Sequence, residues 1–356
     1  MINSRVWTTV ALAIALAARS VAPASAQDDE LSVLLVTAHP DDEAAFAAAV
    51  YRISQGLNGK VDLAVVTDGS GGYTYSHLAE PIYGLKLTDE AVARQYLPAI
   101  RKQELMAGGN IIGIRNYFFL DQFDHAFTLN ADTVLQHVWD ATFVRRRLRQ
   151  IMERGTYDFV FVHMPMTTFH GHHQSATILA LEASSEIDGV AKPVVLAAFP
   201  GNKSDTTAFE FDGVPGYPIT KLRDPDQVFV FDRTTPLDES GRLNYQIIVN
   251  WMIAEHRSQG TMQLFMNAWD IERFWIFDVN DSGPGRRQRR SFAASTAPGR
   301  KQVEDRLDRR SARPIGIPVI PSAECPANPP NPGSSRAAPN REDIANKRHR
   351  VTDQTG

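Results

Sequence analysis

Histidine and carboxylate residues gather in two short segments of the sequence that could together bind a metal ion. The first segment, Ala38-His39-Pro40-Asp41-Asp42-Glu43, follows an apolar run of strand length. The second holds four of the ten histidines within eleven residues, from His163 to the run His170-Gly171-His172-His173. Catalytic zinc takes three protein ligands and keeps one position open for water, and histidine and carboxylate side chains are suitable ligands.

The spacing within these segments indicates which residues hold the ion. His39 and Asp42 are three residues apart across a strand-to-helix turn, so both side chains can converge on one metal, and His173 completes the set. We predict these three as ligands of Zn²⁺, although the same donors accept other divalent ions. Taken alone, Asp41 to Glu43 could equally be the acidic cap of a helix.

A metal held in this way predicts hydrolysis of an amide bond. Bound zinc activates a water molecule near neutral pH, and Asp41 would take the proton of that water as the general base. His170 would stabilise the oxyanion and could protonate the leaving amine. We assign Glu43 and His172 to supporting positions around these groups.

The elements that must position these residues alternate along the chain. Apolar runs of strand length are separated by longer amphipathic stretches, which predicts an α/β fold with a mainly parallel sheet covered by helices. The expected strands are Ser32 to Ala38, Val61 to Thr67, Tyr117 to Leu120, Asp158 to His163 and Pro193 to Phe199. The expected helices are Asp42 to Ser54, Asp89 to Gly108, Ala131 to Arg154 and His173 to Ser185. Both histidine segments then follow strands, at the sheet edge where ligands of α/β folds gather.

Later elements are less regular. We expect a strand over Gln227 to Phe231 and a helix over Asn244 to His256. The aromatic segment from Phe265 to Phe277 is expected to close the core, and a platform for stacking sugars is the alternative.

Three regions differ in composition and predict the domain organisation. Residues 1–26 have the layout of a cleavable signal peptide: Arg5, an apolar run from Val6 to Ala18, and Ala24-Ser25-Ala26 at the end. A membrane anchor is the alternative, but the run is short for a span. We expect cleavage after Ala26 and a secreted or periplasmic protein, with a catalytic domain over residues 27–280.

The charge balance separates this domain from the last region. Residues 27–280 carry 20 Lys and Arg against 33 Asp and Glu, whereas residues 281–356 carry 15 against 8. The acidic domain argues against a nucleic-acid partner. Residues 281–356 are rich in Pro and Arg, so we expect a disordered tail that is solvated or contacts an anionic envelope surface. Cys325 is the only cysteine, which excludes an intrachain disulfide and a cysteine metal cluster.

The chain resembles the LmbE-like deacetylases, the family of N-acetylglucosaminyl-phosphatidylinositol de-N-acetylase (PIG-L), over about residues 31 to 280. The resemblance rests on the segment from Ala38 to Glu43, the pair His170 and His173, and a late His256-Arg257-Ser258-Gln259 segment. It implies a Rossmann-like fold without a nucleotide and zinc at the residues matching His39, Asp42 and His173. It also implies a base matching Asp41, an acid or oxyanion role for the residue matching His170, and removal of acetyl from an N-acetylglucosamine unit.

Two positions leave the details open. Many relatives have an aspartate where His172 stands. Arg101, which with Glu104 also carries the resemblance, could bind substrate, but at helical spacing the two are equally an ordinary surface pair. We expect a small-molecule or glycan substrate. A zinc amidase on a non-sugar amide and a metal-dependent carbohydrate-binding protein without turnover are the alternative functions.

Overall fold

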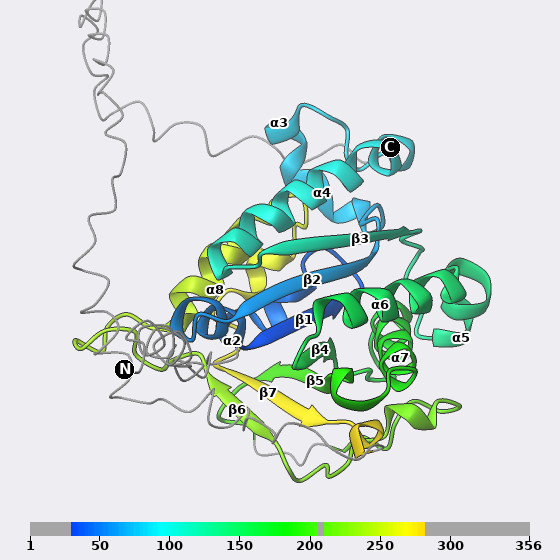
Figure 1. Cartoon of the computed structure of the whole chain (residues 1–356). Coiled ribbons are helices and arrows are strands. Elements are labelled where there is room, and N and C mark those ends of the chain that lie inside the picture. The colour runs from blue at the N-terminus through cyan, green and yellow to red at the C-terminus, as the bar shows by residue number, and fades with distance from the viewer. Residues whose placement is uncertain (1–29, 206–209, 282–356) are drawn as a thin grey trace, which may run out of the picture. The chain divides into compact units, whose positions relative to one another are not determined.

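A seven-stranded sheet forms the centre of the chain in the computed structural model, which describes residues 30–205 and 210–281 (Figure 1). The strand order is β3-β2-β1-β4-β5-β7-β6, with parallel pairing from β3 to β5 and antiparallel pairing of β7 with β5 and β6. The strands are β1 (Ser32–Thr37), β2 (Lys60–Thr67), β3 (Asn116–Gln122), β4 (Phe159–His163), β5 (Val194–Gly201), β6 (Phe229–Asp232) and β7 (Ile271–Ile276). The predicted signal peptide, the predicted tail beyond residue 281 and Cys325 lie outside the described residues.

The parallel strands are arranged as in a Rossmann-like fold, which confirms the predicted fold class. The chain runs outward from β1 through β2 to β3, and then returns to the other side of β1 to form β4 and β5. The strand order therefore reverses between β1 and β4, and a crevice opens there at the carboxyl ends of the strands. The two histidine segments follow these same two strands.

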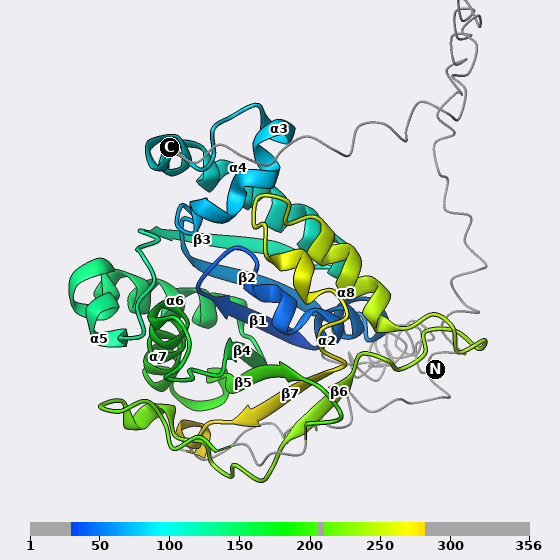
Figure 2. The ribbon, with the colours of Figure 1, turned by 180° about the vertical axis from the view of Figure 1, so that it is seen from behind.

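Helices cover both faces of the sheet. Figure 1 shows α6 and α7 over one face, and Figure 2 shows α2 and α8 over the other. Two separate apolar clusters lie beneath these layers, one on each face. The helices are α2 (Ala47–Tyr51), α3 (Glu80–Tyr83), α4 (Glu90–Ile112), α5 (Ala131–Thr133), α6 (Ala141–Gly155), α7 (Gly171–Ser185) and α8 (Tyr245–Ala254). Among them, no helix combines the length and apolar composition needed to cross a membrane.

The long helix predicted from Ala131 to Arg154 is wrong as a single element. A π-helical turn follows α5 and ends at Trp139, whose backbone is extended. The Trp139 indole donates a hydrogen bond to the carbonyl of Phe123 (3.2 Å), and the side chain of Asp140 accepts from the backbone of Phe143 (2.8 Å) to cap α6. A tertiary contact and a new helix cap thus divide the stretch in two.

The late aromatic segment closes the core, as predicted. Phe274, Trp275 and Phe277 of this segment are at most 1% exposed. They belong to or follow β7, which lies between β5 and β6. Because β7 is antiparallel to β5, the chain that precedes it reaches the sheet at the carboxyl end of β5. This geometry brings residues from the 260s to the edge that holds the histidines.

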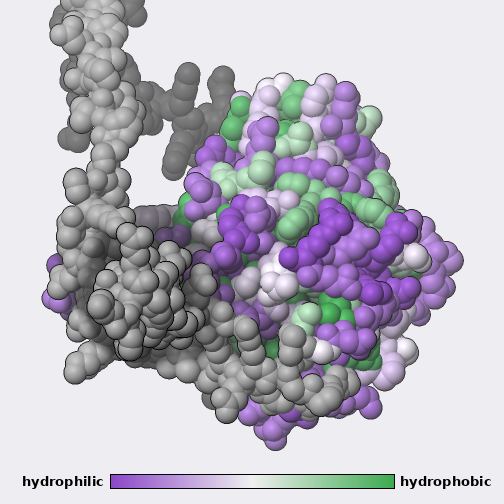
Figure 3. All heavy atoms as spheres, viewed as in Figure 1, coloured by the Kyte–Doolittle hydropathy of each residue, from purple (hydrophilic) through white to green (hydrophobic). Residues whose placement is uncertain are grey.

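Hydrophilic side chains gather over α6 on the face shown in Figure 3. Arg145 lies 3.3 Å from Glu186, and Arg149 lies 2.9 Å from Glu153 and 3.2 Å from Glu186. The arginine cluster of this helix is therefore a solvated surface with paired charges.

Candidate metal centre

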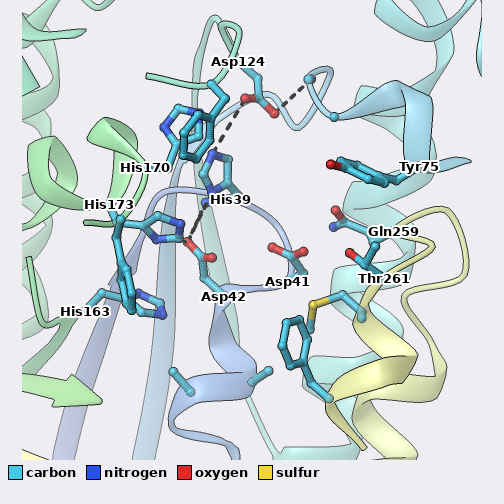
Figure 4. Close-up of a pocket in the computed structure, with 18 of the residues that line it drawn as sticks. His39, Asp41, Asp42, Tyr75, Asp124, His163, His170, His173, Gln259 and Thr261 are labelled. Carbon is cyan, nitrogen blue, oxygen red and sulfur yellow. Dashed lines mark hydrogen bonds and ion pairs between the residues drawn. The ribbon is translucent and has the colours of Figure 1, made fainter. Parts of the chain in front are cut away.

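The first motif turns away from the sheet directly after β1, and the turn is held by one carboxylate. Oδ2 of Asp42 accepts hydrogen bonds from the backbone N–H groups of Ala38 (2.9 Å) and His39 (2.8 Å). A short 3-10 helix, Asp42–Ala45, then leads into α2. These bonds fix the Asp42 carboxylate beside the His39 ring (Figure 4).

The second motif begins α7 after β4. His170 is the N-terminal cap of this helix, and its Nδ1 accepts a hydrogen bond from the backbone N–H of His172 (3.0 Å). His173 lies in the first turn, where the helix points its ring toward Asp42. The two motifs therefore meet, although more than 120 residues separate them in the sequence.

His39, Asp42 and His173 form a set that fits a metal ion. Asp42 Oδ2 lies 3.7 Å from Nδ1 of His39 and 3.5 Å from Nδ1 of His173, and one donor atom from each residue lies within 4.8 Å of the others. Nδ1 of His173 is buried and makes no hydrogen bond to any described residue. A donor kept dry and unpaired is costly unless a ligand completes it, and two histidines with one aspartate suit zinc.

The pKa values of the three predicted ligands shift in different directions, upward for His39 and downward for His173 and Asp42. Burial alone would lower the pKa of His39, but the carboxylates of Asp124 and Asp42 outweigh it and raise the pKa to about 9. Burial lowers the pKa of His173 to about 3. Although burial opposes it, the histidines around Asp42 hold its pKa well below the usual range. The Asp42 carboxylate and the neutral His173 are thus ready to bind a cation, and His39 must release a proton to do so.

Asp41 stands beside this set, separate from the three donors (Figure 4). Burial and, next, the charge of Asp42 raise its pKa to about 7. A general base works best when its pKa is close to the working pH. The role of Asp41 as the general base stays a prediction.

His170 faces the pocket from the other side of the set. Because its Nδ1 accepts a hydrogen bond from a backbone N–H, the neutral ring carries its proton on Nε2. Burial lowers the pKa of His170 to about 3, so the ring is neutral at pH 7. A neutral ring with a fixed N–H donor suits oxyanion stabilisation better than protonation of the leaving amine. The structure thus favours the first of the two roles predicted for His170.

His172 contacts a carboxylate that the sequence did not single out. Nδ1 of His172 lies 3.0 Å from Nε2 of His39 and 3.5 Å from Oδ1 of Asp124, and that same oxygen lies 3.7 Å from Nε2 of His39. Asp124 therefore supports His39 from the side opposite to Asp42. His172, which is fully buried, contacts both His39 and Asp124. A carboxylate behind a metal-binding histidine fixes the ring and its tautomer.

The position of Asp124 depends on a glycine. Its Oδ2 accepts a hydrogen bond from the backbone N–H of Gly71 (2.9 Å), and a Cβ at residue 71 would lie only 2.6 Å from this carboxylate. Asp124 follows β3, and an acid after a predicted strand was a signal available from the sequence. Asp121 gives the same signal but is exposed and bonds Lys102, so sequence alone did not distinguish the two.

Glu43 lies behind the motif and contacts a histidine from a late segment of the chain. Its Oε1 is 2.6 Å from Nε2 of His256, and both side chains are fully buried. Gln259 from the same late segment donates a hydrogen bond to the carbonyl of Pro40 (2.8 Å). The segment His256 to Gln259 therefore holds the turn that carries Asp41 and Asp42.

Arg101 and Glu104 are not a surface pair. They are 3% and 5% exposed, respectively. The Arg101 guanidinium donates to the carbonyls of Gly69 (2.8 Å) and Gly71 (2.6 Å), and Glu104 accepts from the backbone and hydroxyl of Ser258. Arg101 lines the pocket, but its contacts fix the loop beside Asp124, so a direct substrate contact stays a prediction.

A pocket of about 700 Å³ opens beside the metal set. Its wall includes His163 at the end of β4, whose ring lies 5.1 Å from that of His173. Many of its other residues are aromatic: Tyr75, Phe127, Phe169, Phe199, Phe265 and Trp269. The volume is in the range of sites that bind small molecules.

Comparison with protein families identifies the segment that carries the site. Residues 34–184 match the family described as PIG-L, GlcNAc-PI de-N-acetylase. The match includes every residue predicted here as a ligand or catalytic group, from His39 to His173. It confirms the predicted family resemblance and, with it, the predicted class of N-deacetylase. No curated protein matches the chain.

Solved structures with a similar fold are distant in sequence. N,N'-diacetylchitobiose deacetylase from Pyrococcus horikoshii is 16% identical with a TM-score of 0.42, over 80% of this chain and 97% of that one. The zinc-inhibited form of teicoplanin deacetylase is 17% identical (TM-score 0.43), over 69% and 97%. A 4-carboxy-2-hydroxymuconate hydratase from Pseudomonas putida is 19% identical (TM-score 0.38), over 69% and 95%.

Proposed function

We propose that this chain, whose residues 34–184 match the PIG-L family, is a zinc-dependent N-deacetylase of an N-acetylglucosamine-type sugar or conjugate. The observation that carries the proposal is the meeting of His39, Asp42 and His173 in one pocket, with Asp41 beside them. These donors would hold the zinc. Bound zinc supplies a Lewis acid that activates water and polarises the amide carbonyl.

The other residues have separate tasks in this reaction. Asp41, with a pKa of about 7, accepts the proton of the attacking water and can pass it to the leaving amine. His170 donates its Nε2–H to the oxyanion that forms as the carbonyl is attacked. Asp124 and His172 hold the His39 ring, and Glu43 with His256 supports the turn from behind.

The direct test is acetate release by purified protein from N-acetylglucosamine and its short oligomers. We expect release that is lost after chelation and restored by zinc, with about one zinc bound per chain on metal analysis. Protein that contains no metal and does not respond to added zinc would refute the proposal.

We also propose that the chain is exported, with removal of residues 1–26. The support is the layout of Arg5, the apolar run that follows and Ala24-Ser25-Ala26. The mass of the protein recovered from the periplasm or medium of an expressing bacterium tests this. We expect a mature chain that begins at Gln27, and an uncleaved chain in the cytoplasm would contradict it.

A further inference from the structure

One part of the pocket wall is apolar, and three of its six side chains are buried while the other three are half-buried. It is built by Ala44, Ala45, Phe199, Met262, Phe265 and Trp269, which we call the apolar chamber. Ala44 and Ala45 are each 5% exposed, and Met262 is 8% exposed. The rings of Phe265 and Trp269 stack with their centres 4.8 Å apart. The chamber directly adjoins the metal set, because Ala44 and Ala45 follow Asp42 in the same short helix.

The mouth of the pocket differs from the chamber. Tyr75 and Phe127, which also line the pocket, are 59% and 71% exposed. Thr261 and His125, which also line the pocket, are polar. A sugar or a larger conjugate therefore has its path to solvent at the mouth, where its hydroxyl groups stay hydrated or find polar partners.

The apolar chamber offers few hydrogen-bond partners for the hydroxyl groups of a sugar. None of its six side chains is charged, and only the Trp269 indole N–H can donate a hydrogen bond. Burying sugar hydroxyl groups there without partners is unfavourable, whereas burying methylene groups is favourable. When an amide lies at the metal set with its amine part toward the mouth, the group that enters the chamber is the acyl group.

Resting on the proposed function, we infer that the apolar chamber is an acyl subsite and that the preferred substrates carry N-acyl chains several methylenes longer than acetyl. An acetyl group has one methyl to place in this space and leaves most of the apolar wall uncovered. The reaction remains a hydrolysis: water adds to the carbonyl carbon, the C–N bond breaks, the carboxylate leaves with the acyl chain and the amine takes the proton.

A chain-length series tests the inference. Glucosamines with N-acetyl, N-butanoyl, N-hexanoyl and N-octanoyl groups are compared on the full zinc-loaded protein. We expect kcat/KM to rise by roughly fourfold for each methylene that becomes buried, until the chamber is full. An octyl glycoside of N-acetylglucosamine places a similar chain on the amine side. The inference is overturned if the octyl glycoside gains as much as the N-acyl series, or if acetyl is the best acyl group.

Three variants locate the effect. Ala45→Leu fills the chamber and should lower the ratio of hexanoyl to acetyl turnover by about tenfold or more. Trp269→Ala removes one wall and should also lower this ratio. Trp251→Ala is the matched control, because Trp251 lies on α8, is 58% exposed and does not line the pocket, so the ratio should stay unchanged. Unchanged ratios in both chamber variants contradict the inference.

Binding without turnover separates this inference from the proposed function. Calorimetry on zinc-loaded Asp41→Asn protein should show tighter binding of N-hexanoyl than of N-acetyl glucosamine. If this difference is found but the wild type hydrolyses neither compound, the acyl subsite stands and the proposed function is wrong. If acetate is released but longer chains bind no better, the proposed function stands and the acyl subsite is wrong.

Discussion

Two buried polar clusters adjoin the segment that runs from the first motif into α2, and they differ in how their charges are paired. In one cluster, Glu272 accepts hydrogen bonds from the backbone of Ala48 and Ala49 (both 2.9 Å) and from Nε of Arg233 (3.0 Å). Arg233 also donates to the carbonyl of Ala44 (2.7 Å). The other cluster, the metal set, brings donors together but leaves the buried Nδ1 of His173 without a hydrogen bond from the described residues.

The difference separates a structural cluster from a functional one. The carboxylate of Glu272 and the guanidinium of Arg233 are fully buried and neutralise each other, so this pair anchors the start of α2 to β6 and β7. The metal set instead gathers two histidines and one aspartate whose donor atoms lie within 4.8 Å of one another, an arrangement that could hold a cation. Each cluster contains a buried nitrogen without a hydrogen bond from the described residues, Nη1 of Arg233 and Nδ1 of His173, so an unpaired atom alone does not separate them. What separates them is that one cluster pairs two opposite charges, which indicates a structural role, whereas the other brings together three metal-type donors.

The largest effect is expected at Asp41. Asp41→Asn removes the base and should lower kcat by about a hundredfold to ten-thousandfold, while zinc content stays unchanged because Asp41 is not among the three donors. Steady-state kinetics and metal analysis measure the two quantities. Asp188→Asn is the control, because Asp188 is exposed and does not line the pocket. Near wild-type turnover with zinc bound would show that the proton goes elsewhere.

Glu272→Gln tests the buried ion pair of Glu272 with Arg233. It leaves the Arg233 charge buried without its partner, so we expect the free energy of unfolding to fall by about 3–5 kcal/mol. Urea denaturation measures this loss. The protein that remains folded should keep its zinc, because the pair does not contact the donors. Loss of zinc with unchanged stability would reverse the roles that we assign to the two clusters.

Asp124→Asn tests whether the Asp124 carboxylate holds the His39 ring in place for metal binding. We expect zinc affinity to fall by about 10- to 100-fold, since the His39 ring loses the carboxylate that orients it. Competition with a chelator gives the affinity, and Asp121→Asn, near the end of the same strand, is the matched control. If both variants bind zinc as the wild type does, Asp124 is not a partner of His39.

The smallest effect is expected for a charge pair in the solvated surface. Glu153→Gln breaks the contact with Arg149 on α6, where both side chains are more than 40% exposed. Water screens such a pair, so denaturation and turnover should both match the wild type within error. A loss as large as that of Glu272→Gln would mean that exposure does not decide which pairs stabilise this protein.

Local patterns predicted the parts of the molecule that depend on local interactions. The parallel strands and the motif from His39 to Glu43 were visible because apolar alternation and short spacing are properties of neighbouring residues. Asp124 was missed because it meets His39 only through the loop after β3. The break at Trp139 depends on its contact with Phe123, and the burial of Arg101 depends on the loop at Gly69 to Gly71.

The antiparallel course of β7 has a consequence for how the protein is made. The donors of the metal set have all been synthesised once residue 173 is reached, and they follow the parallel strands β1 and β4 along the chain. The walls contributed by Phe265 and Trp269 arrive about a hundred residues later and depend on β7 reaching β5. The segment from His256 to Gln259, which holds the turn carrying Asp41 and Asp42, also comes late in the chain. Both the support of the donors and this part of the pocket wall therefore depend on the last part of the chain to be synthesised.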